Sequence, residues 1–170
     1  MQNPTYFTEN QSSGLNPHDE LSPKESATVI VDHVINGIEI AKKNNLPDRV
    51  IDFIRTHHGT SSTYYFFKKE QELNPDTKVD IKKFQYQGPI PFSKETAILM
   101  ICDAAEAASK SIKNLTAQLI DELIDKIVAK QMEDNQFINA EINFKEIETV
   151  KKVIKKKLKS IYHLRIEYPE

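Results

Sequence analysis

VIDFIRTHHG, residues 50–59, joins an apolar run to two adjacent histidines and a glycine. Neutral imidazole is the commonest side-chain metal ligand, and adjacent residues on a helix point about 100° apart. His57 and His58 at a helix end could therefore serve two neighbouring metal ions, or one metal ion and one substrate phosphate. The alternative is an ordinary helix C-terminus, where histidine faces the negative end of the dipole and Gly59 supplies the left-handed cap. This segment alone does not decide between the two interpretations.

The composition favours a single all-α domain. The chain has 170 residues, enough for a hydrophobic core, and only four glycines among long helix-forming stretches. Its formal charge of -2 gives no electrostatic reason to expect a nucleic-acid polymer as a partner. The single cysteine, Cys102, excludes an internal disulfide and fits a reducing compartment. No signal peptide is visible, and no run approaches the roughly 18 apolar residues of a membrane span.

Loop signals and helical spacing divide the chain into two parts. Residues 1–21 contain loop-forming dipeptides such as Asn3-Pro4 and Asn16-Pro17, so we expect a loop segment that packs against something larger. The sequence Ser22-Pro23-Lys24-Glu25 is typical of a capped helix start. Apolar spacing predicts helices over 23–41, 47–59, 64–67, 93–112, 116–132 and 144–161, with a long ordered loop over 74–91. We expect the helix over 93–112 to be apolar nearly all round.

Three histidines and one aspartate are the candidate metal ligands. Asp103 lies in the most apolar stretch, where a buried carboxylate must be paired, hydrogen-bonded or bound to metal. A helix cap or an arginine partner is the structural alternative for Asp103, and a hydrogen-bonded core position is the alternative for His33. Together, His33, His57, His58 and Asp103 would come from three helices, and such convergence is a known way to build a metal site in a bundle. These ligands suit Mn, Fe, Co or Zn better than Ca or Mg.

Further motifs occur in an order that is typical of one family. They are Asn16-Pro17-His18-Asp19-Glu20-Leu21-Ser22-Pro23, His33-Val34-Ile35-Asn36-Gly37, Leu46-Pro47, His57-His58-Gly59-Thr60, Tyr64-Tyr65-Phe66, Gly88-Pro89-Ile90-Pro91-Phe92-Ser93-Lys94-Glu95, Ile98-Leu99-Met100-Ile101-Cys102-Asp103, Glu106-Ala107-Ala108-Ser109 and Ile161-Tyr162-His163-Leu164-Arg165-Ile166-Glu167-Tyr168-Pro169. Through them nearly the whole chain resembles the cytoplasmic HD hydrolase domain of the bacterial seven-transmembrane-HD receptors. These receptors are membrane-anchored phosphodiesterases that cleave cyclic di-AMP to the linear dinucleotide. The resemblance implies an all-α HD-domain helical bundle over residues 22–170, with residues 1–21 continuing from an upstream part of the domain.

The resemblance also implies a site with two divalent transition metal ions, Mn or Fe, in the complete domain. The positions that match metal ligands are His33, His57, His58 and Asp103, and Asp103 and His58 are also assigned to catalysis. In such sites a metal-activated water attacks phosphorus in line while both ions stabilise charge on the phosphate oxygens. The weaker candidates for contacts with the cyclic dinucleotide are Lys94, Arg55 and Tyr64. The alternative is an exposed ion pair for the two cations and core packing for the tyrosine.

The chain departs from the family pattern at its start. The family's first metal histidine and its His-Asp signature pair lie upstream of Asn3-Pro4-Thr5-Tyr6-Phe7, and His18-Asp19 belongs to a downstream loop, so we do not take it for the metal-bridging pair. The fold is therefore expected to be N-terminally truncated. Its four remaining ligands would hold one ion weakly or none, and we expect little or no hydrolase activity from these 170 residues.

The resemblance places the parent protein at the bacterial inner membrane, with this domain on the cytoplasmic face. The 170 residues themselves are expected to be soluble, and a homodimer is left open. Two other functions also stay open. One is a non-catalytic signalling module that binds the nucleotide, and the other is an HD phosphohydrolase that acts on another nucleotide or phosphoester.

Overall fold

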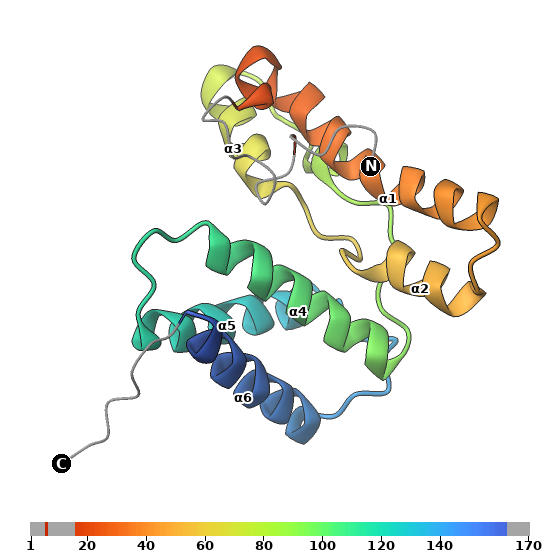
Figure 1. The fold of residues 1–170 in the computed structure, drawn as a ribbon. Coiled ribbons are helices and arrows are strands. Elements are labelled where there is room, and N and C mark those ends of the chain that lie inside the picture. Colours follow the sequence, from red (N-terminus) through yellow and green to blue (C-terminus); the bar gives the residue numbers. More distant parts are fainter. Residues whose placement is uncertain (1–5, 7–15, 163–170) are drawn as a thin grey trace. The chain divides into compact units, whose positions relative to one another are not determined.

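The computed structural model describes Tyr6 and residues 16–162 of the chain, which forms two compact units, Met1–Pro89 and Ile90–Glu170 (Figure 1). All named secondary-structure elements in the described residues are helices, so the predicted all-α class is confirmed. An isolated antiparallel bridge between Ser62 and Gln85 is the one extended pairing in the same residues. The boundary between the units falls inside the region from residue 22 onward that was expected to form one helical domain.

Over residues 16–89, which the structure describes without a gap, the first unit has three α-helices and two short 3-10 helices. These are η3 (Pro17–Glu20), α1 (Pro23–Lys43), α2 (Asp48–Thr56), α3 (Tyr64–Leu73) and η4 (Ile81–Phe84). The predicted capping box opens α1, since the Ser22 hydroxyl accepts from the Glu25 amide and the Glu25 carboxylate accepts from the Ser22 amide at 2.9 Å. The aromatic helix predicted over 64–67 continues to Leu73, and η4 interrupts the loop predicted over 74–91.

In the first unit α1 packs against α2, α3 and η4. Ala27, Phe66 and Phe84 form a small buried cluster there. Residue 37 is a glycine where α1 passes α2, because a Cβ atom at Gly37 would lie 3.0 Å from Cγ2 of Ile54. This close approach brings the C-terminal end of α2 toward the middle of α1.

The opening of the described chain also packs into the first unit. His18 in η3 is buried, with its Nε2 2.9 Å from the Tyr6 carbonyl oxygen and its ring 5.1 Å from that of Phe66. The His18-Asp19 dipeptide therefore contributes a buried contact to the fold.

The second unit is a three-helix unit of α4 (Lys94–Lys110), α5 (Ala117–Glu133) and α6 (Phe144–Ile161). Its core is larger and is built from Ala97, Met100, Ile101, Ala105, Leu115, Ile120, Ile124, Val128, Phe137, Ile147, Ile154 and Leu158. The helix predicted over 93–112 to be apolar nearly all round is not buried on every side, because Leu99, Cys102 and Glu106 are exposed. A helix packed against two neighbours on one side buries only the face that meets them.

Ion pairs join the outer edges of α5 and α6. Asp125 accepts from Lys151 and Lys155, each at 2.8 Å, and Asp121 accepts from Lys159 at 2.7 Å. In the residues that the structure describes, no helix is both long enough and apolar enough to cross a membrane.

Candidate metal centre

Three histidines of the first unit converge between α1 and the end of α2. His33 lies on α1, and His57 and His58 directly follow the last residue of α2. One ring nitrogen from each of the three lies within 4.8 Å of the others. Elsewhere in the described chain, no three His, Cys, Asp or Glu ligand atoms come this close together. Three of the four predicted ligands are thus brought together.

The end of α2 places its two histidines side by side. Gly59 is buried and has a φ of 52°, in the left-handed region that glycine adopts without strain, and its amide donates to the Thr56 carbonyl at 2.9 Å. Gly59 therefore adopts the expected left-handed conformation, but it lies two residues beyond His57, which is the C-cap residue of α2. The same backbone turn also directs His57 and His58 toward His33, with ring centroids 5.2 and 5.0 Å from the His33 ring.

Backbone carbonyls fix the proton positions on two of the rings. Nδ1 of His33 lies 2.5 Å from the Ile30 oxygen, and Nδ1 of His57 lies 2.7 Å from the Ile54 oxygen. Since a carbonyl oxygen only accepts, both Nδ1 atoms carry the proton, and Nε2 of each neutral ring is an acceptor. Metal-binding histidines are typically held in this way by a carbonyl or carboxylate on the other nitrogen.

The two acceptor nitrogens face each other. Nε2 of His33 and Nε2 of His57 are 3.1 Å apart. Two lone pairs at this distance repel unless a proton or a cation lies between them. The donor set therefore fits a divalent transition metal ion, for which imidazole is a suitable ligand.

The surroundings keep the imidazoles of His57 and His58 neutral. Burial lowers the pKa of His57, and burial together with the neighbouring charges of His57 and His33 lowers the pKa of His58 from 6.5 to about 2. A neutral imidazole has the free lone pair that metal binding requires, so no proton has to be displaced at neutral pH.

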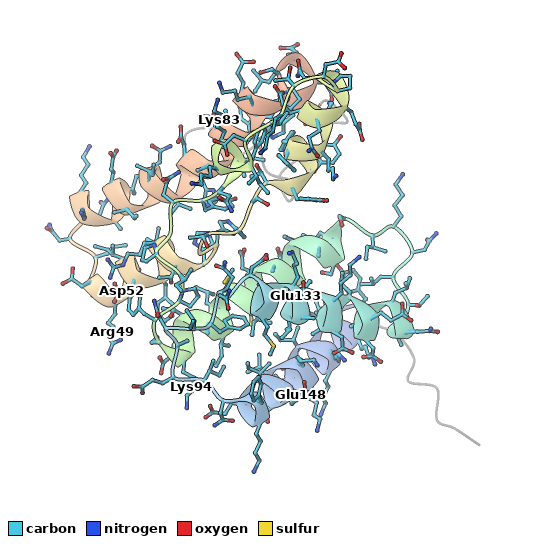
Figure 2. The ribbon with its side chains drawn as sticks, turned by 180° about the vertical axis from the view of Figure 1, so that it is seen from behind. Arg49, Asp52, Lys83, Lys94, Glu133 and Glu148 are labelled. Carbon is cyan, nitrogen blue, oxygen red and sulfur yellow. The ribbon has the colours of Figure 1, made fainter. Side chains whose placement is uncertain are left out.

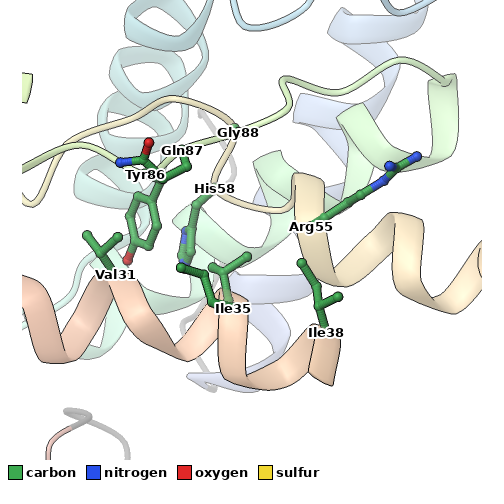
Figure 3. A pocket seen from close by; sticks show the side chains of 10 residues that line it. Val31, Ile35, Ile38, Arg55, His58, Tyr86, Gln87 and Gly88 are labelled. Carbon is green, nitrogen blue, oxygen red and sulfur yellow. The ribbon is translucent and has the colours of Figure 1, made fainter. Parts of the chain in front are cut away.

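Tyr86 is a site residue that the sequence analysis missed. Its ring stacks on His58, with centroids 4.2 Å apart and planes inclined at 22° (Figure 3). Together they line one side of a pocket of about 40 Å³ against apolar side chains of α1 such as Val31 and Ile35. The available signal was the alternation Phe84-Gln85-Tyr86, in which the two aromatic residues are buried and the glutamine is less so.

Asp103, the fourth predicted ligand, lies on α4 in the second unit and is half-buried. Burial and then the charge of Asp103 raise the pKa of the adjacent Cys102 thiol. The role of Asp103 as a metal ligand stays a prediction.

Lys94 and Arg55, the two basic residues predicted to contact the substrate, both form ion pairs. Lys94 lies at the start of α4 (Figure 2), and its ammonium is 2.5 Å from the Glu146 carboxylate. Arg55 lines the same pocket as His58, but its guanidinium points away from that ring (Figure 3) and contacts Asp52 at 2.7 Å. The ion-pair alternative is therefore observed for both.

Tyr64 does not pack in the core. It is 57% exposed, and the ammonium of Lys68 lies 5.6 Å from its ring centroid. Core packing, the alternative given for Tyr64, is wrong, because Phe66 is the residue of this aromatic run that is buried.

A family model for the HD domain matches residues 11–108, so the chain belongs to the HD-domain family. The predicted HD-domain helical bundle is confirmed. The chain is 42% identical to the cyclic-di-AMP phosphodiesterase PgpH of Listeria monocytogenes and 38% identical to PgpH of Bacillus subtilis, over 167 residues in each case. Both alignments cover 98% of this chain but only 23% of the relative, so the chain spans less than a quarter of these proteins.

Two solved structures of the L. monocytogenes PgpH HD domain have the same fold. The HD domain in complex with cyclic-di-AMP has a TM-score of 0.90 and 40% identity, covering 95% of this chain and 74% of the other. The second structure of this HD domain has a TM-score of 0.88 and 38% identity. The chain is thus homologous to a phosphodiesterase HD domain over nearly all of its length.

Proposed function

We propose that this HD domain hydrolyses cyclic di-AMP to the linear dinucleotide, with two divalent transition metal ions, Mn or Fe, in the complete domain. The observation that carries the proposal is the pair of imidazole acceptor nitrogens, on His33 and His57, that face each other at 3.1 Å. A homologous HD domain with 40% identity has been crystallised with cyclic-di-AMP, which supports this substrate.

The proposed ligands are His33, His57, His58 and Asp103. The three imidazoles would each supply a nitrogen ligand, and the carboxylate of Asp103 would add negative charge that compensates a divalent ion. When bound, divalent ions supply Lewis acidity to the phosphate oxygens and lower the pKa of a water molecule. His58 and Asp103 would contribute to catalysis through the ions that they hold.

The remaining residues have secondary roles in the proposal. Arg55 and Lys94 would each have to exchange a carboxylate partner for a substrate phosphate. The exposed ring of Tyr64 offers a face for stacking on adenine.

We further propose that these 170 residues alone have little or no turnover. The four proposed ligands are few for a two-metal centre, so they would hold one ion weakly. The greater length of the relatives supports a larger parent protein. The resemblance further leads us to propose that this parent is membrane-anchored, with this domain on the cytoplasmic side.

The test is a cleavage assay on the natural polypeptide that contains this domain, with the 170-residue chain beside it. Each is incubated with cyclic di-AMP and Mn²⁺ or Fe²⁺, and the linear product is measured by chromatography. We expect the natural polypeptide to cleave the substrate and the His57→Ala variant to lose at least about 100-fold in rate, since a metal ligand is removed. His18→Ala is the matched control, because it removes a buried imidazole of the same unit that lies against Tyr6 and Phe66.

Each other outcome has a clear meaning. Tight binding of cyclic di-AMP without cleavage would replace the proposal with a non-catalytic signalling module. Cleavage of other nucleotides in place of cyclic di-AMP would make the domain an HD phosphohydrolase of different specificity. Normal turnover by the 170-residue chain would contradict the proposed dependence on further ligands.

A further inference from the structure

Tyr86 contacts two of the three clustered histidines. Its ring stacks on His58, and it meets the His33 ring edge-on, with centroids 5.9 Å apart and planes at 85°. The tyrosine is only 8% exposed, so these two imidazoles are a substantial part of its surroundings.

Backbone hydrogen bonds hold the stacked pair together. The Tyr86 amide donates to the Ser61 carbonyl at 2.9 Å, and the Thr63 amide donates to the Phe84 carbonyl at 2.8 Å. These bonds flank the bridge between Ser62 and Gln85. The segment that leaves His58 is therefore paired with the segment that contains Tyr86, which sets the distance between the two rings.

The His58 ring has aromatic neighbours on two sides. His58 lies beyond the last residue of α2, and its ring lies between the rings of Tyr86 and His57, with centroids at 4.2 and 4.0 Å. Offset stacking of aromatic rings is favourable and restricts rotation of the side chain.

We propose that Tyr86 is a positioning residue, whose ring holds the His58 imidazole toward the His33–His57 pair and so raises the affinity of the cluster for a divalent metal ion. The metal-binding part of this inference rests on the proposed function. This role depends on the ring and not on the hydroxyl group. Phenylalanine at position 86 should therefore preserve the orientation of His58, and an aliphatic residue should not.

The experiment compares Tyr86→Leu and Tyr86→Phe with the wild-type chain by calorimetric titration with Mn²⁺. We expect Tyr86→Leu to lower the Mn²⁺ affinity about 10-fold, as loss of an orienting partner of a ligand typically does, and Tyr86→Phe to stay within about twofold. Phe84→Leu is the matched control, because Phe84 is a buried aromatic residue two positions away that packs against Phe67. It should destabilise the unit without changing the Mn²⁺ affinity.

A second measurement on the metal-free chain keeps the inference separate from the proposed function. The Tyr86 ring should shift the His58 ring protons upfield in the NMR spectrum. This shift should disappear in Tyr86→Leu and persist in Tyr86→Phe. If the wild-type chain binds no Mn²⁺, the proposed metal binding by this chain fails, and the His58 resonances alone decide whether Tyr86 positions the ring.

Either of two kinds of result, from the NMR spectrum or from the titration, would overturn the inference. One is an unchanged His58 resonance in Tyr86→Leu. The other is a wild-type Mn²⁺ affinity in Tyr86→Leu, or an equal loss in Phe84→Leu, which would mean that general stability of the unit accounts for the effect.

Discussion

A histidine binds a metal ion only through a ring nitrogen that carries no proton, so the protonation of each imidazole decides what a histidine cluster can do. In His33 and His57 the neighbouring carbonyl oxygens assign the proton to Nδ1 and leave Nε2 as an acceptor. In His58, burial and the two other imidazoles favour the neutral ring. These contacts leave ring nitrogens available for a cation.

The lowered pKa values predict that the metal-free chain loses stability in mild acid. Burial lowers the pKa of His58 to about 2 in the folded chain, whereas the ordinary pKa of 6.5 applies in the unfolded chain. Between these values the unfolded state binds more protons, so the free energy of unfolding is fully retained above about pH 6.5 and falls as the pH decreases. We expect the thermal midpoint in EDTA to be lower at about pH 5 than at about pH 7.5.

The His58→Asn variant is the control for this pH dependence. It should show a smaller decrease over the same range, because the group that titrates has been removed. Asp125 and Glu146 contribute little there, because their ordinary pKa values of 3.8 and 4.5 lie below this pH range and their partners lower the folded values further. An equal decrease in the wild-type chain and the variant would show that His58 is not the responsible group.

At the residue scale, the sequence predicted the three histidines but missed Tyr86. The histidines stand out because their residue type and helical placement are visible locally. Tyr86 joins them through the pairing of two irregular segments around Ser62 and Gln85, and such a long-range contact leaves only a short alternation in the sequence. The protonated nitrogen of His33 and of His57 also could not be predicted, because it depends on the direction of backbone carbonyl oxygens in the folded helix.

At the scale of elements, the site depends on how closely α1 and α2 approach. Gly37 on α1 lies against Ile54 on α2, and the distance leaves almost no room for a side chain. His33 is one turn before Gly37, and His57 is three residues after Ile54. The spacing of the two helices therefore also sets the spacing of the imidazoles.

A Gly37→Val substitution tests this dependence. The new side chain should clash with Ile54 and cost about 1–3 kcal/mol in the free energy of unfolding, as overpacking typically does. Urea denaturation measures the effect. Asn36→Val, on the exposed side of the same helix, adds the same β-branched residue and should change stability by less than about 0.5 kcal/mol. Similar costs for both variants would mean that helix propensity, rather than the contact with Ile54, is responsible.

Element boundaries were predicted well where local signals set them. The capping box at Ser22 fixes the start of α1, and apolar spacing gave α6 its observed bounds, Phe144–Ile161. The extension of α3 to Leu73 was missed because residues after Phe67 are polar and carry no periodic apolar signal. The exposed side of α4 was missed because alanine fits both buried and exposed positions.

At the scale of the whole molecule, the described residues form two hydrophobic clusters, one in each of the two compact units. The second unit contains the larger cluster, centred on fully buried residues such as Ile124 on α5. Residue periodicity could not reveal this division, since apolar spacing shows that a helix has a buried face but not which helices share a core.

Truncation of Ile124 tests whether each unit is stabilised by its own core. Ile124→Ala should cost about 2–5 kcal/mol, because it leaves a cavity in a closely packed cluster. Hydrogen exchange should accelerate in α5 and α6 more than in α1 and α2. Leu119→Ala on the exposed side of α5 is the control and should have a much smaller effect. Equal acceleration in all helices would show that the two units unfold together.

The most direct test of the account is a Mn²⁺ titration of the 170-residue chain followed by calorimetry. We expect one saturable site in the wild-type chain and in His18→Ala, with the affinity of His33→Ala reduced at least about 10-fold. These two variants each remove one imidazole from the first unit, and only one of them belongs to the histidine cluster. Absence of Mn²⁺ binding by the wild-type chain, or equal binding by His33→Ala, would contradict the assignment of the cluster as a metal site.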